Sequence, residues 1–103
     1  MRPPGRLLEV GCGGGAQLVP LALKGYDCTG IDCSPAVLSR LSNYGQEVSR
    51  LSGQPLALRT FAGTFPDAVP DDGCFDLVYE FGVVEHAYTQ ARVGRLASKG
   101  GAV

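Results

Sequence analysis

The sequence has no tryptophan, one methionine and one histidine, and its four cysteines include no Cys-x-x-Cys pair. Structural zinc sites need paired thiols or a cluster of cysteine and histidine ligands, so the sequence predicts no metal site. Unpaired cysteines in a chain without secretory features are expected to stay reduced. The sparse ligand set therefore excludes the common zinc-dependent classes of function.

Runs of one charge are also missing. No two Lys or Arg residues are adjacent, and the formal net charge is -1. Such a chain lacks the basic patch of a protein that binds nucleic acid or a membrane surface. No apolar run approaches the roughly 18 residues of a membrane span. The apolar stretch within the first ten residues is too short for a signal peptide. We therefore expect a cytoplasmic protein with a small ligand, no nucleic-acid partner and no membrane partner.

The composition is that of one folded domain. Of the 103 residues, 45% are hydrophobic and 18% are charged. Apolar segments at residues 6–10, 26–31, 56–61 and 75–79 alternate with helix-like segments at residues 16–24, 35–49 and 89–98. Gly25 is expected to end the first helix, and Ser34 and Pro35 to begin the second. This alternation predicts an α/β fold with a parallel sheet, in which residues 101–103 begin a fifth strand.

A glycine cluster follows the first expected strand in the stretch "LLEVGCGGG", residues 7–15. Glycines between a strand and a helix let a ligand approach the main chain without meeting a Cβ. Residues 11–16 satisfy the dinucleotide pattern G-x-G-x-x-A, and Asp32 ends the second expected strand. The same stretch satisfies E-x-G-x-G-x-G, which resembles the first motif of the class I S-adenosylmethionine-dependent methyltransferases. The resemblance implies a cationic ligand, which the carboxylate of Glu9 would favour. A tight strand-to-helix turn without a ligand is the third interpretation.

Asp32 suits both ligand classes, because its two carboxylate oxygens can accept from the two hydroxyls of an adenosine ribose. Its alternative role is to help cap the helix that begins near Ser34. Cys33, Ser34 and Pro35 offer no cation, so a 2′-phosphate is disfavoured. If Asp32 binds ribose, Asp32→Ala should weaken cofactor binding with little effect on folding.

The second half of the chain distinguishes these interpretations. The stretch "FPDAVPDDGCFDLVYEFGVVEH" and the later "RLASKGG" resemble the class I S-adenosylmethionine-dependent methyltransferases in order and spacing. The resemblance runs from about Gly5 to Val103. It implies a Rossmann-like doubly wound parallel sheet with strand order 3-2-1-4. Residues 1–103 would then be a single S-adenosylmethionine-binding domain that is truncated and lacks the C-terminal strands.

The resemblance also implies roles for individual residues. Glu9 would lie near the amino group of S-adenosylmethionine, and Asp32 would hold its ribose. An acidic residue is usual near the adenine, but here that position is Thr64. Adenine recognition would therefore be weakened or would shift to the backbone near Phe65, and Asp67 is an alternative acid. His86 would be a catalytic base or would have a structural role at the start of the following helix. The full set of implied cofactor-binding residues is Glu9, Gly11, Cys12, Gly13, Gly15, Asp32, Cys33, Thr64, Phe65, Glu80 and Phe81.

The resemblance implies a methyltransferase for a small-molecule acceptor, similar to quinone-pathway enzymes. Tyr79 and Phe81 would either turn aromatic faces toward the sulfonium or pack in the core. Two alternatives stay open: a truncated, non-catalytic module for cofactor binding or interaction, and a fragment of an NAD-dependent oxidoreductase. The fourth strand would lack its usual second neighbour, so we expect self-association through its exposed edge.

Overall fold

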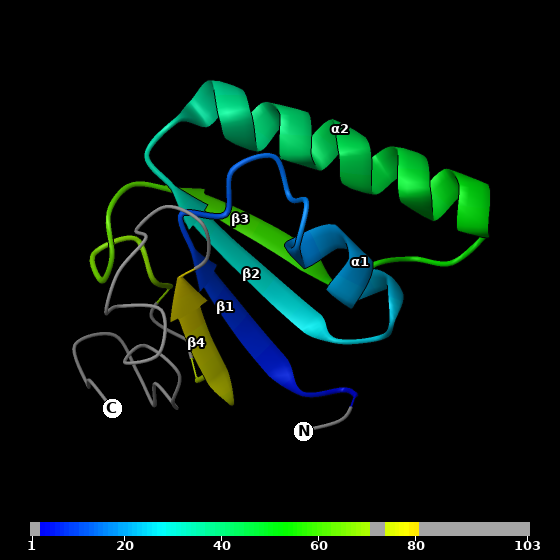
Figure 1. The fold of residues 1–103 in the computed structure, drawn as a ribbon, viewed down its shortest axis with the longest axis horizontal. Coiled ribbons are helices and arrows are strands. Elements are labelled where there is room, and N and C mark those ends of the chain that lie inside the picture. Colours follow the sequence, from blue (N-terminus) through cyan, green and yellow to red (C-terminus); the bar gives the residue numbers. More distant parts are fainter. Residues whose placement is uncertain (1–2, 71–73, 81–103) are drawn as a thin grey trace.

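The computed structural model describes residues 3–70 and 74–80 (Figure 1). Four strands form one parallel sheet in the order β3-β2-β1-β4. Two helices connect the first three strands. The elements are β1 (Arg6–Val10), α1 (Leu18–Leu23), β2 (Asp27–Asp32), α2 (Pro35–Ser52), β3 (Leu58–Ala62) and β4 (Leu77–Glu80). The predicted α/β class and the strand order 3-2-1-4 are confirmed.

Helix α1 begins two residues later than the sequence predicted. Gly15 adopts a φ of 87° and its N–H donates to the Cys12 carbonyl over 3.2 Å, so the chain is still turning there. Pro20 falls in the first turn of α1, where a backbone N–H has no partner within the helix, so the proline is tolerated. Gly25 follows the helix with a φ of 106°, and its predicted role as helix terminator is confirmed.

Helix α2 begins as predicted and continues further. The Ser34 hydroxyl accepts a hydrogen bond from the Val37 N–H at 3.2 Å, and Pro35 is the first helical residue. The predicted end at residue 49 is wrong, because helical geometry persists to Ser52. The left-handed conformation of Gly53, with a φ of 73°, then terminates the helix.

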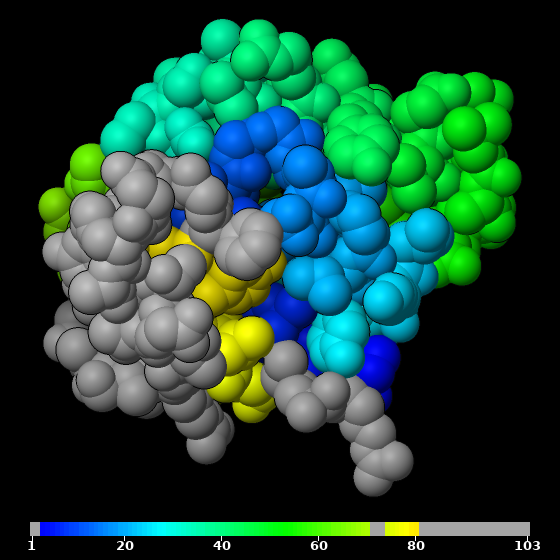
Figure 2. Space-filling view, in the orientation of Figure 1, coloured from blue at the N-terminus to red at the C-terminus, as the bar shows by residue number. Residues whose placement is uncertain are grey.

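The two faces of the sheet bury different side chains. Helices α1 and α2 pack side by side on one face (Figures 1 and 2), over the cluster Leu7, Cys12, Leu18, Val19, Ala22, Cys28, Leu38 and Leu41. The chain between β3 and β4 supplies Val69 and Phe75 to a second cluster with Leu8, Ile31 and Val78. Connections therefore cross both faces, as a doubly wound sheet requires.

Strand β4 lies at one end of the described sheet and pairs with β1. It begins at Leu77 rather than at residue 75, and Phe75 is buried just before it. Self-association through the outer edge of β4 stays a prediction. The expected helix at residues 89–98 and the expected strand at 101–103 lie outside the described residues. Within the described ranges, no helix is long and apolar enough to cross a membrane.

Candidate functional site

The carboxyl ends of the parallel strands meet at one edge of the sheet, where open α/β sheets bind their ligands. The loop after β1 is fixed to β2 there, because the N–H groups of Gly11 and Cys12 donate to the Ile31 carbonyl at 2.7 and 3.0 Å. The Gly63 N–H donates to the Asp32 carbonyl at 3.0 Å, which brings the loop after β3 to the same edge. The glycine loop, the end of β2 and the loop after β3, all predicted to form the site, are therefore brought together.

The glycines of the loop are required for different structural reasons. A Cβ on Gly13 or Gly14 would meet no atom within 4 Å, so both leave main chain open to a ligand. A Cβ on Gly15 would lie 2.8 Å from Leu41 Cγ and 2.9 Å from Val19 Cγ2. Gly15 is therefore required for close packing of the loop against both helices. Its predicted contact with a ligand is a separate matter and stays a prediction.

Gly30 is a residue that the sequence reasoning missed. It lies in the middle of β2, beside Glu9 in the register of the sheet. A Cβ there would lie 2.6 Å from Cys12 Sγ and 2.9 Å from Leu18 Cδ2. The absence of a side chain at Gly30 thus allows the glycine loop to pack closely against β2. A glycine inside an apolar strand is the signal that would have indicated such a close approach.

Asp32 links two elements of the site. One carboxylate oxygen accepts from the Gly13 N–H at 3.0 Å, and the other accepts from the Ser34 N–H at 3.0 Å. The side chain therefore fixes the glycine loop and the start of α2, as the capping interpretation proposed. Each oxygen keeps a second lone pair, so ribose binding remains compatible with these bonds. Because two backbone donors would lose their acceptor, these bonds favour a loss of stability in Asp32→Ala beside the predicted loss of cofactor binding.

We expect Asp32→Ala to lower the free energy of unfolding by about 2–4 kcal/mol, since each lost charge-assisted bond contributes about 1.5–3 kcal/mol and water replaces part of it. Asp32→Asn keeps one carbonyl acceptor and should cost about half as much. Urea unfolding of both variants measures this effect. Equal stability of Asp32→Ala and the wild type would contradict the two hydrogen bonds.

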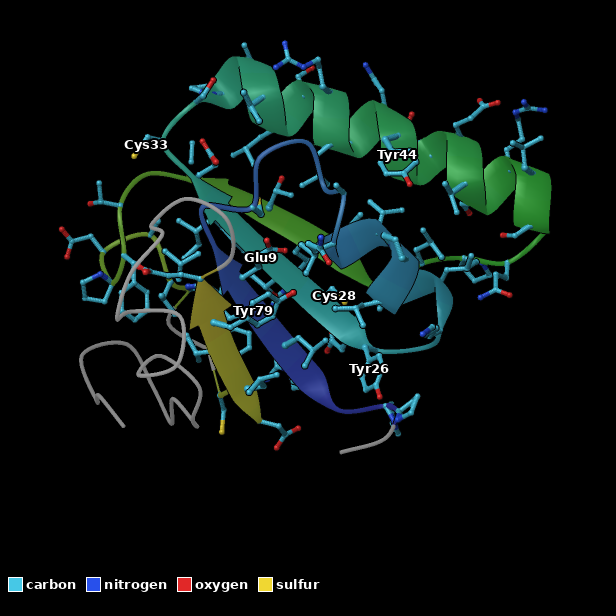
Figure 3. All side chains as sticks on the ribbon, in the orientation of Figure 1. Glu9, Tyr26, Cys28, Cys33, Tyr44 and Tyr79 are labelled. Carbon is cyan, nitrogen blue, oxygen red and sulfur yellow. The ribbon has the colours of Figure 1, made fainter. Side chains whose placement is uncertain are left out.

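Glu9 is a buried acid in the centre of the sheet edge. Its side chain is 2% exposed, and Oε1 accepts a hydrogen bond from the Tyr79 hydroxyl at 3.2 Å (Figure 3). Burial raises the pKa of Glu9 to about 7, although the bond from Tyr79 lowers it. The pKa of Cys12 rises to about 12 because of burial and the negative charge of Glu9. The thiol of Cys12, in the glycine loop, is therefore neutral at pH 7.

The loop after β3 carries the predicted adenine contacts. Thr64 is exposed, and its carbonyl accepts from the Ala68 N–H at 2.8 Å. Phe65 is half-buried and packs against the cluster on the sheet face opposite the helices. Cys33 is exposed, and its thiol lies 3.5 Å from the Gly63 carbonyl. Cys33 and Thr64 thus follow neighbouring strands, as the predicted site requires.

At the end of β4, Tyr79 and Glu80 lie on opposite faces of the sheet. Tyr79 is opposite Glu9 in the β1–β4 register, and Glu80 is opposite Val10. Successive strand residues face opposite sides, so Tyr79 shares the helix side with Glu9 while Glu80 lies on the other side. One oxygen of Glu80 is buried without a hydrogen-bond partner. Phe81 and His86 lie outside the described residues.

Within residues 3–70 and 74–80, no group of three His, Cys, Asp or Glu side chains is arranged to hold a metal ion. Cys12, Cys28 and Cys33 have free thiols. Two carboxylates, a glycine loop and a loop after β3 thus make up the described part of the site.

Comparison with known protein families identifies the family to which the chain belongs. Residues 8–99 match a methyltransferase domain family, and those residues include the glycine loop, Asp32 and the whole described sheet edge. The chain belongs to the class I S-adenosylmethionine-dependent methyltransferases. The predicted family resemblance is confirmed.

Individual members of this methyltransferase family show the same likeness. The chain is 37% identical to a ubiquinone biosynthesis O-methyltransferase of Methylococcus capsulatus, over 95% of this chain and 41% of that protein. It is 34% identical to the protein of the same name from a Methylobacterium species, over 88% of this chain and 34% of that protein. The chain therefore spans well under half the length of these relatives.

Solved methyltransferase structures share the fold. An S-adenosylmethionine-dependent methyltransferase from Thiobacillus denitrificans, in complex with S-adenosylhomocysteine, superposes with a TM-score of 0.62 at 25% identity, over 81% of this chain and 32% of that one. An arsenic(III) S-adenosylmethionine methyltransferase from Chlamydomonas reinhardtii gives 0.69 at 25% identity, over 86% and 32%. These neighbours match the parallel sheet and its flanking helices.

Proposed function

We propose that this methyltransferase chain binds S-adenosylmethionine and forms the cofactor-binding part of an enzyme that methylates an oxygen of a small-molecule acceptor. The observation that carries the proposal is the convergence of a buried acid, open glycine main chain and Asp32 at one sheet edge. The identity to ubiquinone biosynthesis O-methyltransferases supports an oxygen acceptor, such as the phenolic hydroxyl of a quinol-like molecule.

The residues present are compatible with this cofactor. The amino group of S-adenosylmethionine is cationic, and Glu9 is a buried carboxyl group with no described cation beside it on β1, β2, β4 or α1. The open main chain at Gly13 and Gly14 would accept the methionine end, with Gly11 and Cys12 in the same loop. Asp32 would bind the ribose through its remaining lone pairs. When bound, the cofactor supplies a methyl group that its positive sulfur activates toward a nucleophile.

The acceptor side of the reaction would use residues beyond the described ranges. We keep His86 as the proposed base, since an imidazole can take a proton from a phenol near neutral pH. Phe81 and Glu80 stay proposed contacts near the sulfonium. A cytoplasmic location stays part of the same proposal.

We expect S-adenosylhomocysteine to bind at least about tenfold more tightly than NAD. NAD brings a pyrophosphate close to the glycine loop, where the described residues of the loop supply no cation, and it has no amino acid ammonium to pair with Glu9. Calorimetric titration of the two ligands into the same sample is the measurement. A preference for NAD would overturn the proposed function in favour of the oxidoreductase alternative.

Thr64 provides a second test, because it stands where the family usually has an acid. Thr64 is exposed, so Thr64→Asp should fold normally and offer a charge-assisted bond to the adenine amino group. We expect S-adenosylhomocysteine to bind about three- to tenfold more tightly to this variant. Thr60→Asp, on the preceding strand, is a control that should give no gain. Weaker binding by Thr64→Asp would show that the adenine is held differently.

A further inference from the structure

Tyr79 is the one aromatic side chain of the described site that makes a hydrogen bond to a predicted cofactor residue. Cross-strand pairing places it directly opposite Glu9, and its hydroxyl donates to Glu9 Oε1 at 3.2 Å. On the other side of Glu9 in the register lies Gly30, which has no side chain to offer a second donor. Figure 3 shows Glu9 and Tyr79 directed toward one another. The fold therefore gives the buried acid a single side-chain donor within the described residues.

We propose that Tyr79 is a positioning residue which holds Glu9 in place, so that capture of the cofactor's ammonium group is coupled to the loss of one proton from Glu9. This inference rests on the proposed function. The proton passes from the Glu9 carboxyl group to the buffer, and no bond of the ligand is made or broken. The ammonium then faces a carboxylate whose geometry is already fixed by the tyrosine.

The surroundings of Glu9 explain why the proton is retained without ligand. The group is almost fully buried, so its charged form loses hydration. The ionisable groups that act on it are Tyr79 on β4, Cys12 in the loop and Cys28 on β2. Burial raises the pKa of all three, so they are neutral at pH 7 and none is a cation. Helix α1 has no ionisable side chain, and α2 packs here through Leu38 and Leu41. Among the residues that the structure describes, none places a positive charge beside Glu9, so an incoming ammonium would favour its ionisation.

The shifted pKa of Glu9 determines how ligand affinity should change with pH. Because the pKa of Glu9 in the ligand-free protein is about 7, the acid is mostly protonated at pH 6 and mostly ionised at pH 8. Binding that requires the carboxylate should strengthen about tenfold from pH 6 to pH 8, following the ionised fraction. About one proton per ligand should be released at pH 6 and almost none at pH 8. S-adenosylhomocysteine keeps its own amino group charged across this range, since an α-amino group of this kind titrates above it.

Calorimetry tests the proposal with S-adenosylhomocysteine at pH 6, 7 and 8, in buffers of different ionisation enthalpy. 5′-Methylthioadenosine, which lacks the ammonium, is the matched ligand and should show no pH dependence. Glu9→Gln should bind with a flat pH profile, at or below the wild-type affinity at pH 6. Tyr79→Phe removes the donor that stabilises the carboxylate, so its profile should move to higher pH by about half a unit or more. Tyr44→Phe changes an exposed tyrosine of α2 and should match the wild type.

A wild-type affinity that is constant from pH 6 to pH 8 would overturn the proposal. So would an unshifted profile in Tyr79→Phe, or a pH dependence that persists in Glu9→Gln, which would assign the titration to His86. If Tyr79→Phe fails to fold by circular dichroism, the Glu9→Gln profile and the measured proton release still decide the coupling. Absence of S-adenosylhomocysteine binding at every pH, in a folded sample, would instead refute the proposed function.

Discussion

Replacing Gly15 with alanine should lower the free energy of unfolding by about 2–4 kcal/mol, which is a large part of the stability of a domain this small. Two costs combine. The φ of 87° at Gly15 strains any residue with a Cβ, and that Cβ would press on Leu41 Cγ at 2.8 Å and Val19 Cγ2 at 2.9 Å. Because Gly15 begins the turn into α1, relief of the clash would also move the glycine loop. Thermal unfolding should show a fall in Tm of roughly 8 °C or more.

The neighbouring glycine supplies a matched control. Gly14 does not have a positive φ, and a Cβ there would meet nothing within 4 Å. We expect Gly14→Ala to change the free energy of unfolding by less than about 0.5 kcal/mol. Its added methyl group would instead occupy the open side of the loop, so it should weaken S-adenosylhomocysteine binding while folding is preserved. Equal stability loss in the two variants would contradict the distinction between a packing glycine and a ligand-facing glycine.

Glu9→Gln should stabilise the ligand-free protein at pH 8 by about 1–3 kcal/mol. The folded-state pKa of Glu9 is about 7 and the ordinary value is 4.5. Since the unfolded chain loses this proton first, the wild type loses stability as pH rises from about 4.5 to 7, and the loss is complete above that window. The shift corresponds to roughly 3 kcal/mol. Glutamine keeps an acceptor for Tyr79 but carries no charge, so it avoids the penalty.

Urea unfolding at pH 4.5, 6 and 8 measures this effect as the difference between variant and wild type. The difference should be near zero at pH 4.5 and grow toward pH 8. Glu47→Gln alters an exposed acid that pairs with Arg50 on α2, so it should change the free energy of unfolding by less than about 1 kcal/mol. A difference for Glu9→Gln that does not depend on pH would contradict the burial of an ionisable acid. The gain in stability should be accompanied by weaker cofactor binding.

Local signals in the sequence predicted most of the elements correctly. Apolar runs separated by Gly25, Ser34 and Pro35 indicated the strands and both helices, because turn and cap residues act through their own backbone geometry. The errors concern element ends. Helix α1 starts late because Gly15, with a φ of 87°, still belongs to the turn that precedes the helix. Strand β4 starts at Leu77, two residues later than predicted, and the buried Phe75 precedes it.

By itself the sequence determined the parallel α/β architecture, because the alternation of apolar segments with turn and cap residues is a local property. Its resemblance to known motifs indicated the family and predicted the two acids of the proposed site. The tertiary structure alone decided which side chains meet: Gly30 admits Cys12, Asp32 accepts from Gly13, and Tyr79 donates to Glu9 across β4 and β1. It also decided that Glu9 is buried enough to hold its proton near neutral pH. Contacts between strands distant in sequence and the loss of hydration inside a packed core arise only when the chain is folded.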